Sequence, residues 1–293
     1  PEQPELLTSF GDFERIYGGL GDLVFAGTAT PNYLAHAVLA YFNEGGSRLY
    51  VSRVVVATAE DDDGGATAAS VALTGADAED DAAVVLRARF PGAGGNGRVT
   101  VVETVAPTSQ AAMAAAPDGT WLRSGADDAT SDYIKIDGGW MASDDLDGEP
   151  AEVTTIAAAA ARPRIVSLAA SARAADGAEL AWEGLGYDRR HPRWIGYVLA
   201  AAPSRRADHL QNAFAIDIGA DMDAPALREA LFGDAEANTQ EQVRREWVLA
   251  GGSDGTAPQA SAYADALDEI AALEDVSIVA APGATAYGDD ANA

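Results

Sequence analysis

The chain has 293 residues, no cysteine, three histidines and a net charge of −27, from 46 acidic against 19 basic side chains. The lack of cysteine excludes a disulfide framework and thiolate chemistry, and so negative a field repels nucleic acid and anionic lipid. A hydrophobic fraction of 48% suffices for a core, yet no apolar run reaches the roughly 18 residues of a membrane span.

Two helices and a strand are predicted in the first 56 residues. Ser9 is placed to cap a helix over Phe10–Tyr17. A second helix is expected from an N-cap at Thr30 to a stop at Asn43–Gly46. Its helical spacing predicts one apolar stripe, made of Tyr33, Leu34, Ala37, Val38, Tyr41 and Phe42. The β-branched run Leu49–Val56 then predicts a strand covered on both faces.

The middle of the chain predicts short strands around acidic loops. From Ala57 the composition turns to Ala, Thr, Asp and Gly, and we place a domain boundary there. The expected strands are Ala82–Phe90, Arg98–Val105, Trp121–Leu122, Tyr133–Ile136, Val153–Ile156, Ile165–Leu168 and Phe214–Ile218. Helical spacing resumes over Trp194–Ala201, whereas propensity alone does not decide the alanine-rich stretches Ala111–Ala116 and Ala157–Ala161.

The C-terminal part predicts a strand, a helix and a buried strand. These are Glu246–Ala250, Ser261–Leu273 and Val276–Ala280. Joined to the N-terminal helix and strand, they predict a split core, and the expected fold class is α/β (α+β mixed). The expected domains are a core of residues 1–56 plus 246–293 and a β-rich inserted region of residues 57–245.

Six stretches carry a family resemblance in their content and order. They are Thr8–Gly19, Tyr33–Val38, Tyr41–Val54, Pro91–Asn96, Leu249–Gly255 and Leu273–Gly283. Together they resemble the N-terminal and middle portion of contractile tail sheath proteins, the family of phage tails and related contractile injection systems. Sheath subunits usually continue well past the Pro-Gly that matches Pro282-Gly283, and the chain lacks an initiator Met, so a fragment is expected.

The resemblance implies a structural subunit and not an enzyme, without cofactor or metal. It implies hexameric rings stacked helically around an inner tube, with baseplate and terminator proteins as further partners. Contraction would drive the tube through a target envelope. The implied partners include no nucleic acid and no membrane insertion. The resemblance implies that the subunits assemble in the cytoplasm and end up in a virion tail or an injection particle. The sequence leaves open which of these two particles it is. We expect the acidic inserted region on the outer surface.

An enzymatic alternative rests on Gly251–Gly255, which matches the nucleophile-elbow pattern G-x-S-x-G around Ser253. A hydrolase triad in that order needs a later histidine, and none follows His209. A serine hydrolase-like α/β enzyme using Ser253 is therefore the second hypothesis, against a structural glycine turn. A carbohydrate-binding β domain, suggested by the acidic loops and aromatics, is a third.

Other motifs favour structural interpretations. Gly92–Gly97 matches the dinucleotide pattern G-x-G-x-x-G, but a β-rich run follows it, and its Asn-Gly predicts a hairpin connection. The acidic runs Glu60–Asp63 and Asp144–Gly148 approach calcium-loop spacing, but Ser143 and Thr154 hold the first and last positions of the second loop. Both runs are expected to be solvated loops.

The only concentrated positive charge is formed by Arg189, Arg190, His191 and Arg193, which we expect to lie at a subunit interface. His36, beside the apolar stripe, is expected to be a packed side chain and not a metal ligand. The acidity, with Lys135 as the sole lysine, fits either a halophile's hydrated surface or a high-GC genome.

Overall fold

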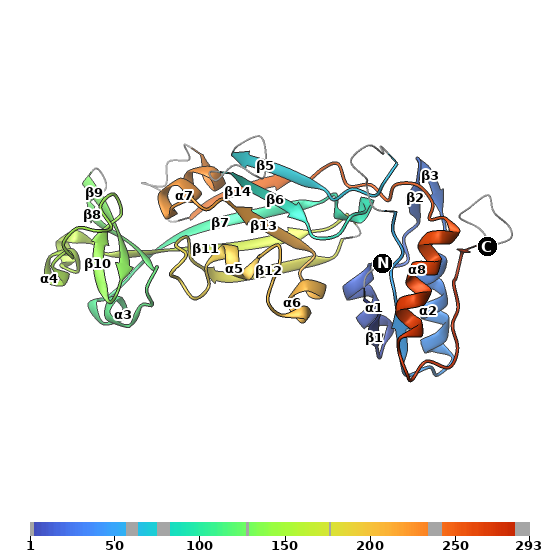
Figure 1. Cartoon of the computed structure of the whole chain (residues 1–293). Helices are drawn as coiled ribbons and strands as arrows, with labels where there is room; N and C mark the ends of the chain where they lie inside the picture. Colours follow the sequence, from blue (N-terminus) through green and yellow to red (C-terminus); the bar gives the residue numbers. More distant parts are fainter. Residues whose placement is uncertain are drawn as a thin grey trace.

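The computed structural model describes residues 3–56, 64–74, 83–126, 129–175, 177–233 and 242–284. The described chain forms a compact unit from its two ends and a long β-rich part between them (Figure 1). We call residues 3–56 and 256–284 the end unit, and the described residues from 64 to 250 the insert. The described pairings between named strands are antiparallel, so the expected mixed class is confirmed in its α+β form.

The end unit contains short strands and three of the longer helices. Its elements are β1 (Glu5–Leu7), α1 (Phe10–Tyr17), β2 (Leu23–Phe25), β3 (Thr28–Thr30), α2 (Tyr33–Asn43), β4 (Leu49–Val51) and α8 (Ala260–Ala271). β1 pairs with β4, and β2 pairs with β3. Five buried side chains form its core, namely Leu7, Phe13, Ala35, Val38 and Val51. Of α8, only Ala266 is buried, so this helix contributes little to that core.

The insert is built on a seven-stranded antiparallel sheet, in which six strands follow the order β10-β9-β8-β11-β7-β14 and the seventh, β12, pairs with β11. Its strands are β7 (Arg98–Pro107), β8 (Trp121–Ala126), β9 (Ala129–Ile136), β10 (Gly139–Ala142), β11 (Arg164–Arg173), β12 (Glu179–Leu185) and β14 (Gln242–Val248). The long strand β11 pairs with β7 along one edge, and with β8 and then β12 along the other.

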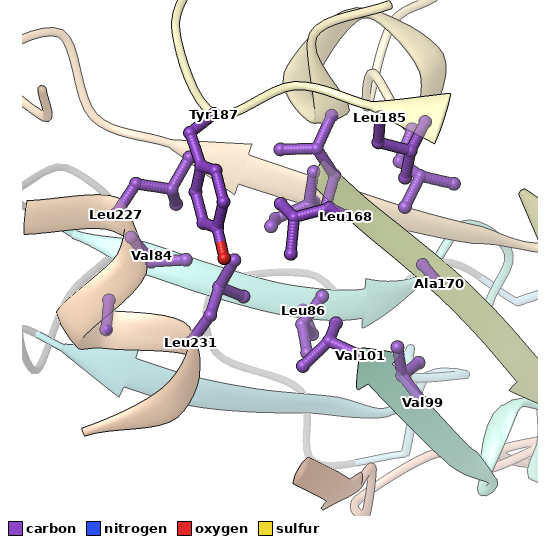
Figure 2. Packing of buried hydrophobic residues seen from close by; sticks show 14 of the residues in the cluster. Val84, Leu86, Val99, Val101, Leu168, Ala170, Leu185, Tyr187, Leu227 and Leu231 are labelled. Atoms are coloured by element: carbon purple, nitrogen blue, oxygen red, sulfur yellow. The ribbon is translucent and has the colours of Figure 1, made fainter. Parts of the chain in front are cut away.

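A second, three-stranded sheet packs on the first. It has the order β13-β6-β5, with β5 (Ser70–Thr74), β6 (Val84–Ala88) and β13 (Phe214–Ile218). Alternate residues of β6, β7 and β11 point into the shared core, where helix α7 (Ala224–Phe232) closes one side. Figure 2 shows Val84, Leu86, Val101 and Leu168 meeting there, with the Tyr187 hydroxyl directed inward.

The far end of the insert has a core of its own. Met113, Leu122, Trp140 and Ile156 are its buried members. They come from α3 (Gln110–Ala115), β8, β10 and α4 (Val153–Ile156), with the 3-10 turn η2 (Ala159–Ala161) beside them. Figure 1 shows these elements at the end of the molecule opposite the end unit. We call this part the tip.

A short neck joins the insert to the end unit, and we define it as residues 67–70, 91–96 and 250–255. Thr67 and Ser253 exchange two backbone hydrogen bonds at 3.0 Å. The side-chain amide of Asn96 donates to the carbonyl of Gly252 at 2.8 Å, and its oxygen accepts the N–H of Gly252 at 2.9 Å. A Cβ at Gly252 would lie 2.6 Å from the carbonyl oxygen of Gly92, so only glycine permits this close approach.

Asp254 connects the neck to the end unit. One carboxylate oxygen accepts the N–H of Ala93 at 2.9 Å, in the 3-10 turn η1 (Ala93–Gly95), and the other accepts the N–H of Val24 in β2 at 2.8 Å. The N–H of Ala26 also donates to the carbonyl of Gly255 at 3.0 Å. A single side chain therefore ties together three segments that are distant in sequence.

In the end unit one expected strand is shorter than predicted and another is absent. The run Leu49–Val56 forms a strand only over β4, because its sole partner β1 spans three residues. Val276–Ala280 forms no strand and is not buried, since Ile278 is 88% exposed and Val279 is 50% exposed. Strand propensity measures how well a residue fits a half-buried sheet, and no described strand pairs with this segment.

The expected strand Val153–Ile156 is also wrong, because it forms helix α4. The N–H of Ile156 donates to the carbonyl of Glu152 at 3.2 Å, and the Ile156 side chain enters the core of the tip. The expected hairpin at Gly92–Gly97 is wrong too, since β6 and β7 belong to different sheets. The glycines instead carry the chain from one sheet to the other.

Details of the second helix differ from expectation. Asn32 and not Thr30 is the N-cap, and its side-chain oxygen accepts the N–H of Ala35 at 3.2 Å. The predicted stripe is half wrong, because Tyr33, Ala37 and Tyr41 are exposed while the buried face is centred on Ala35 and Val38. By contrast α1, capped by Ser9, and the stop of α2 at Asn43 are confirmed.

Candidate functional site: the arginine loop and the apolar groove

The loop Asp188–Trp194 connects β12 with the short helix α5 (Ile195–Val198) and brings all four predicted interface residues together. Buried Asp188 shapes its start by accepting the N–H of Arg190 at 2.8 Å, and it pairs with the Arg190 guanidinium at 3.2 Å. The ring Nδ1 of His191 accepts the N–H of Arg193 at 3.1 Å. The loop therefore holds its own conformation through short-range contacts.

His191 is half-buried and packs on two close-lying glycines. A Cβ at Gly119 would lie 2.2 Å from the backbone nitrogen of His191, and a Cβ at Gly186 would lie 2.3 Å from the His191 ring. Burial lowers the pKa of His191 below its ordinary value of 6.5, against the opposing hydrogen bond from Arg193. The structural setting therefore favours the neutral imidazole.

The three arginines of the loop are exposed but anchored. Arg189 lies 4.5 Å above the ring of buried Trp194 and donates to the carbonyl of Gly219. Arg193 donates to the carbonyl of Glu183 at 2.8 and 3.1 Å. These contacts hold the guanidinium groups of Arg189 and Arg193 in place at the surface.

A second feature is an apolar groove of about 880 Å³ between the end unit and the neck. It is lined by α1, α2, β4, α8, the loop Phe90–Gly95 and the segment Val276–Pro282. Four of the lining apolar side chains stand exposed, namely Tyr41, Leu267, Ile278 and Val279. In the described part of the chain, nothing covers this face.

The predicted nucleophile lies in the neck and not on an elbow. Ser253 follows β14 by five residues and precedes α8 by seven, so it has neither the strand before it nor the helix after it that the motif requires. Its Oγ accepts the N–H of Gly255 at 3.1 Å. Ser253 thus shapes a turn, and no described histidine makes a hydrogen bond with it.

Among the described residues, no group of three or more metal-binding side chains lies together. The turn at Asp144–Gly148 is described and its aspartates are exposed, while Glu60–Asp63 lies outside the described residues. Of the other histidines, His36 is exposed and not packed as expected, because it falls on the outer face of α2. His209 stacks edge-on against Phe90 at 5.3 Å.

Some residues of these sites were not predicted from the sequence. Tyr197 is 61% exposed and stacks edge-on against Trp194 at 4.8 Å, which places it beside the arginine loop. Helical spacing at Trp194–Ala201 could have indicated that neighbourhood. The groove depends on which side chains stay uncovered, and no local pattern carries that information.

In comparisons with known proteins, no family model, no curated protein and no solved structure matches the chain. The helices that the structure describes include none with the length and apolarity needed to cross a bilayer.

Proposed function

We propose that this chain is a structural subunit of a contractile sheath. Its copies would form hexameric rings stacked around an inner tube, bounded by baseplate and terminator proteins, in a virion tail or an injection particle assembled in the cytoplasm. The observation that carries the proposal is the uncovered apolar groove of the end unit. It coincides with the segments whose sequences resemble sheath proteins, including Tyr33–Val38, Tyr41–Val54 and Leu273–Gly283.

The insert and the end unit differ in how completely they bury their apolar side chains. The insert buries a continuous core between its sheets, whereas the end unit buries five core side chains and leaves large apolar ones at its surface. Exposed contiguous apolar surface of this kind marks interaction sites in soluble proteins. A subunit whose end unit is completed by its neighbours would have this distribution.

The proposed work is mechanical and takes its free energy from the lattice. Subunits would assemble in an extended state and move as nearly rigid bodies into a shorter, wider one. The neck supports such a role, because the Asn96 side chain joins two of its segments and Asp254 binds both the neck and Val24 of the end unit. The geometry of the turn at Ser253 gives no support to the hydrolase alternative.

Negative-stain electron microscopy of the full chain tests the proposal, alone and with its tube protein, in high and low salt. Striated tubes or stacked rings are expected. The matched variants are Ile278→Asp with Val279→Asp in the groove, which should prevent assembly, and Val248→Asp, an equally exposed apolar position of β14, which should not. Monomers under every condition would contradict the proposal.

A further inference from the structure

A cationic and aromatic surface stands apart from the apolar groove. We define the arginine patch as Arg189, Arg190, Arg193 and Tyr197. Arg189 and Tyr197 both contact the ring of Trp194, from 4.5 and 4.8 Å, while Arg190 and Arg193 belong to the same short loop. Arginine and tyrosine are the residue types, with tryptophan, that dominate binding energy at protein interfaces.

The charges of the patch are not balanced within the described chain. Arg190 pairs with Asp188, whereas Arg189 and Arg193 donate to carbonyl oxygens of Gly219, Ala220 and Glu183, which are neutral acceptors. Three guanidinium groups therefore face one carboxylate. In a chain with a net charge of −27, this excess of positive charge is unusual and attracts carboxylates.

The patch is also pre-organised. The Arg189 guanidinium is stacked on Trp194, and Arg193 is held by two hydrogen bonds to one carbonyl. Side chains that are already ordered lose less conformational entropy when a partner binds. The surface is thus built to bind and not only to be solvated.

A complementary acidic surface lies at the tip. The turn Ser143–Glu149 follows β10 and exposes the carboxylates of Asp144, Asp145, Asp147 and Glu149. None of the four forms an ion pair with a residue that the structure describes. Among the described residues, the patch therefore keeps an excess of positive charge and the turn keeps four carboxylates without an ion pair.

We propose that the arginine patch binds the acidic turn Ser143–Glu149 of a second copy of this chain. The inference rests on the proposed function, because it names a contact between sheath subunits through their inserts. Such a contact joins two different surfaces, so it repeats from copy to copy and generates a ring or a helical filament. In about 1 M salt the Debye length is only ~3 Å, so long-range repulsion between acidic copies is screened while hydrogen-bonded ion pairs persist.

Cross-linking tests the contact directly, because the chain contains no cysteine. One full-length population carries Glu183→Cys, an exposed position beside Arg193, and the other carries Glu149→Cys at the turn. The matched control replaces Glu149→Cys by Asp268→Cys, which removes an equally exposed carboxylate on α8. With a short bis-maleimide, the turn population should give a roughly tenfold higher yield of heterodimer than the control, since contact raises the effective concentration.

Charge reversal supplies the second arm. Arg190→Glu with Arg193→Glu on the Glu183→Cys chain should reduce the yield to that of the control. The reversal of two exposed arginines elsewhere, Arg173→Glu with Arg205→Glu, should leave the yield unchanged. Circular dichroism confirms that each variant is folded, and Arg193→Gln serves if the double reversal unfolds the loop.

The outcomes separate this inference from the proposed function. Equal yields from the turn and the control population would overturn the contact, even where wild-type tubes are seen by microscopy. A specific cross-link without tubes or rings would support the contact as self-association and contradict the sheath. Loss of the cross-link in Arg173→Glu with Arg205→Glu would also overturn it, because the attraction would then depend on total charge alone.

Discussion

Glu103 is a fully buried carboxylate in the core of the insert, at 0% exposure. The alternation that buries Val99, Val101 and Val105 on β7 buries Glu103 as well. Its oxygens accept two hydrogen bonds from Arg228 of α7, at 2.8 and 3.1 Å, and one from the Tyr187 hydroxyl at 2.6 Å. These three groups join the large sheet, the helix and the arginine loop.

The first prediction concerns this buried pair. Arg228→Met leaves the carboxylate of Glu103 buried without its cation, so the free energy of unfolding should fall by about 3–5 kcal/mol. Guanidinium unfolding followed by circular dichroism measures the change. Arg98→Met, which breaks the exposed pair with Glu246, should cost no more than about 1 kcal/mol. Equal losses in the two variants would contradict a special role for the buried pair.

The second prediction concerns acid stability. Because burial lowers the pKa of His191 in the folded chain, the unfolded chain binds a proton first as the pH falls. The contribution of His191 to stability is therefore complete above its ordinary pKa of 6.5 and is lost as the pH falls through the folded value. Asn at this position keeps an acceptor for the N–H of Arg193 but does not titrate, so melting of His191→Asn should depend less on pH between about 5 and 7. A wild-type slope in that variant would show that other groups cause the acid loss.

At the residue scale, sequence reasoning found groups that act locally and missed those that pair over long distances. The cap at Ser9 and the arginine loop follow from neighbours in sequence. Glu103 and Arg228 are 125 residues apart, and nothing near either residue indicates the other. A carboxylate within a valine-rich strand signals a buried pair without naming the partner.

At the scale of single elements, helix α3 depends on Lys135, the chain's only lysine. The Nζ atom donates to the carbonyls of Met113, Ala114 and Ala116 at 3.1, 2.9 and 2.6 Å. These groups end the helix and have no partner further along it. One ammonium group thus satisfies the C-terminus of α3 and fixes it to β9.

The third prediction follows from this cap. Lys135→Met keeps the length of the side chain but donates no hydrogen bond, so the tip should lose about 1–3 kcal/mol of local stability. Hydrogen exchange of the α3 amides measures it, with the amides of β13 as the internal reference. Lys135→Arg retains the charge and the donors and should exchange more slowly than Lys135→Met. Faster exchange in β13 as well would indicate global unfolding and contradict a local effect.

Elements were predictable where local pattern and tertiary surroundings agree. Phe214–Ile218 forms β13 with the expected bounds, and α8 lies within one or two residues of its prediction. The strands that were predicted wrongly share one cause, which is a β-branched run in surroundings that the sequence does not reveal. Val153–Ile156 packs as a helical turn in the tip, and Val276–Ala280 has no described neighbour to pair with.

At the scale of the whole molecule, the charge sets the response to salt. With a net charge of −27, self-repulsion opposes the compact state, and the range of that repulsion falls from ~10 Å at 0.1 M salt to ~3 Å at 1 M. The fourth prediction is that the melting temperature rises with salt over this interval, as the halophilic interpretation of the acidity requires. Scanning calorimetry measures it. An unchanged melting temperature would favour genome composition as the source of the acidic residues.

The whole arrangement was predictable in outline only. The mixed fold class follows from the alternation of helical and strand patterns, but the pairing of β7 with both β11 and β14 joins segments far apart in the chain. The expected boundary at residue 246 falls inside β14, which continues in the large sheet to Val248. Composition marks where a domain changes and not where its last strand ends.

The neck gives the molecule a mechanical property. β7 and β11 contain ten residues each and so extend about 33 Å along the insert (Figure 1), so a rotation with its pivot near Asp254 would carry their far ends with it. A tilt of about 5° at that pivot would displace the far end of such a ~33 Å strand by about 3 Å, the length of one hydrogen bond. In such a rotation, the few hydrogen bonds of the neck would resist the twist, and their stiffness would set how far the tip moves when the end unit turns.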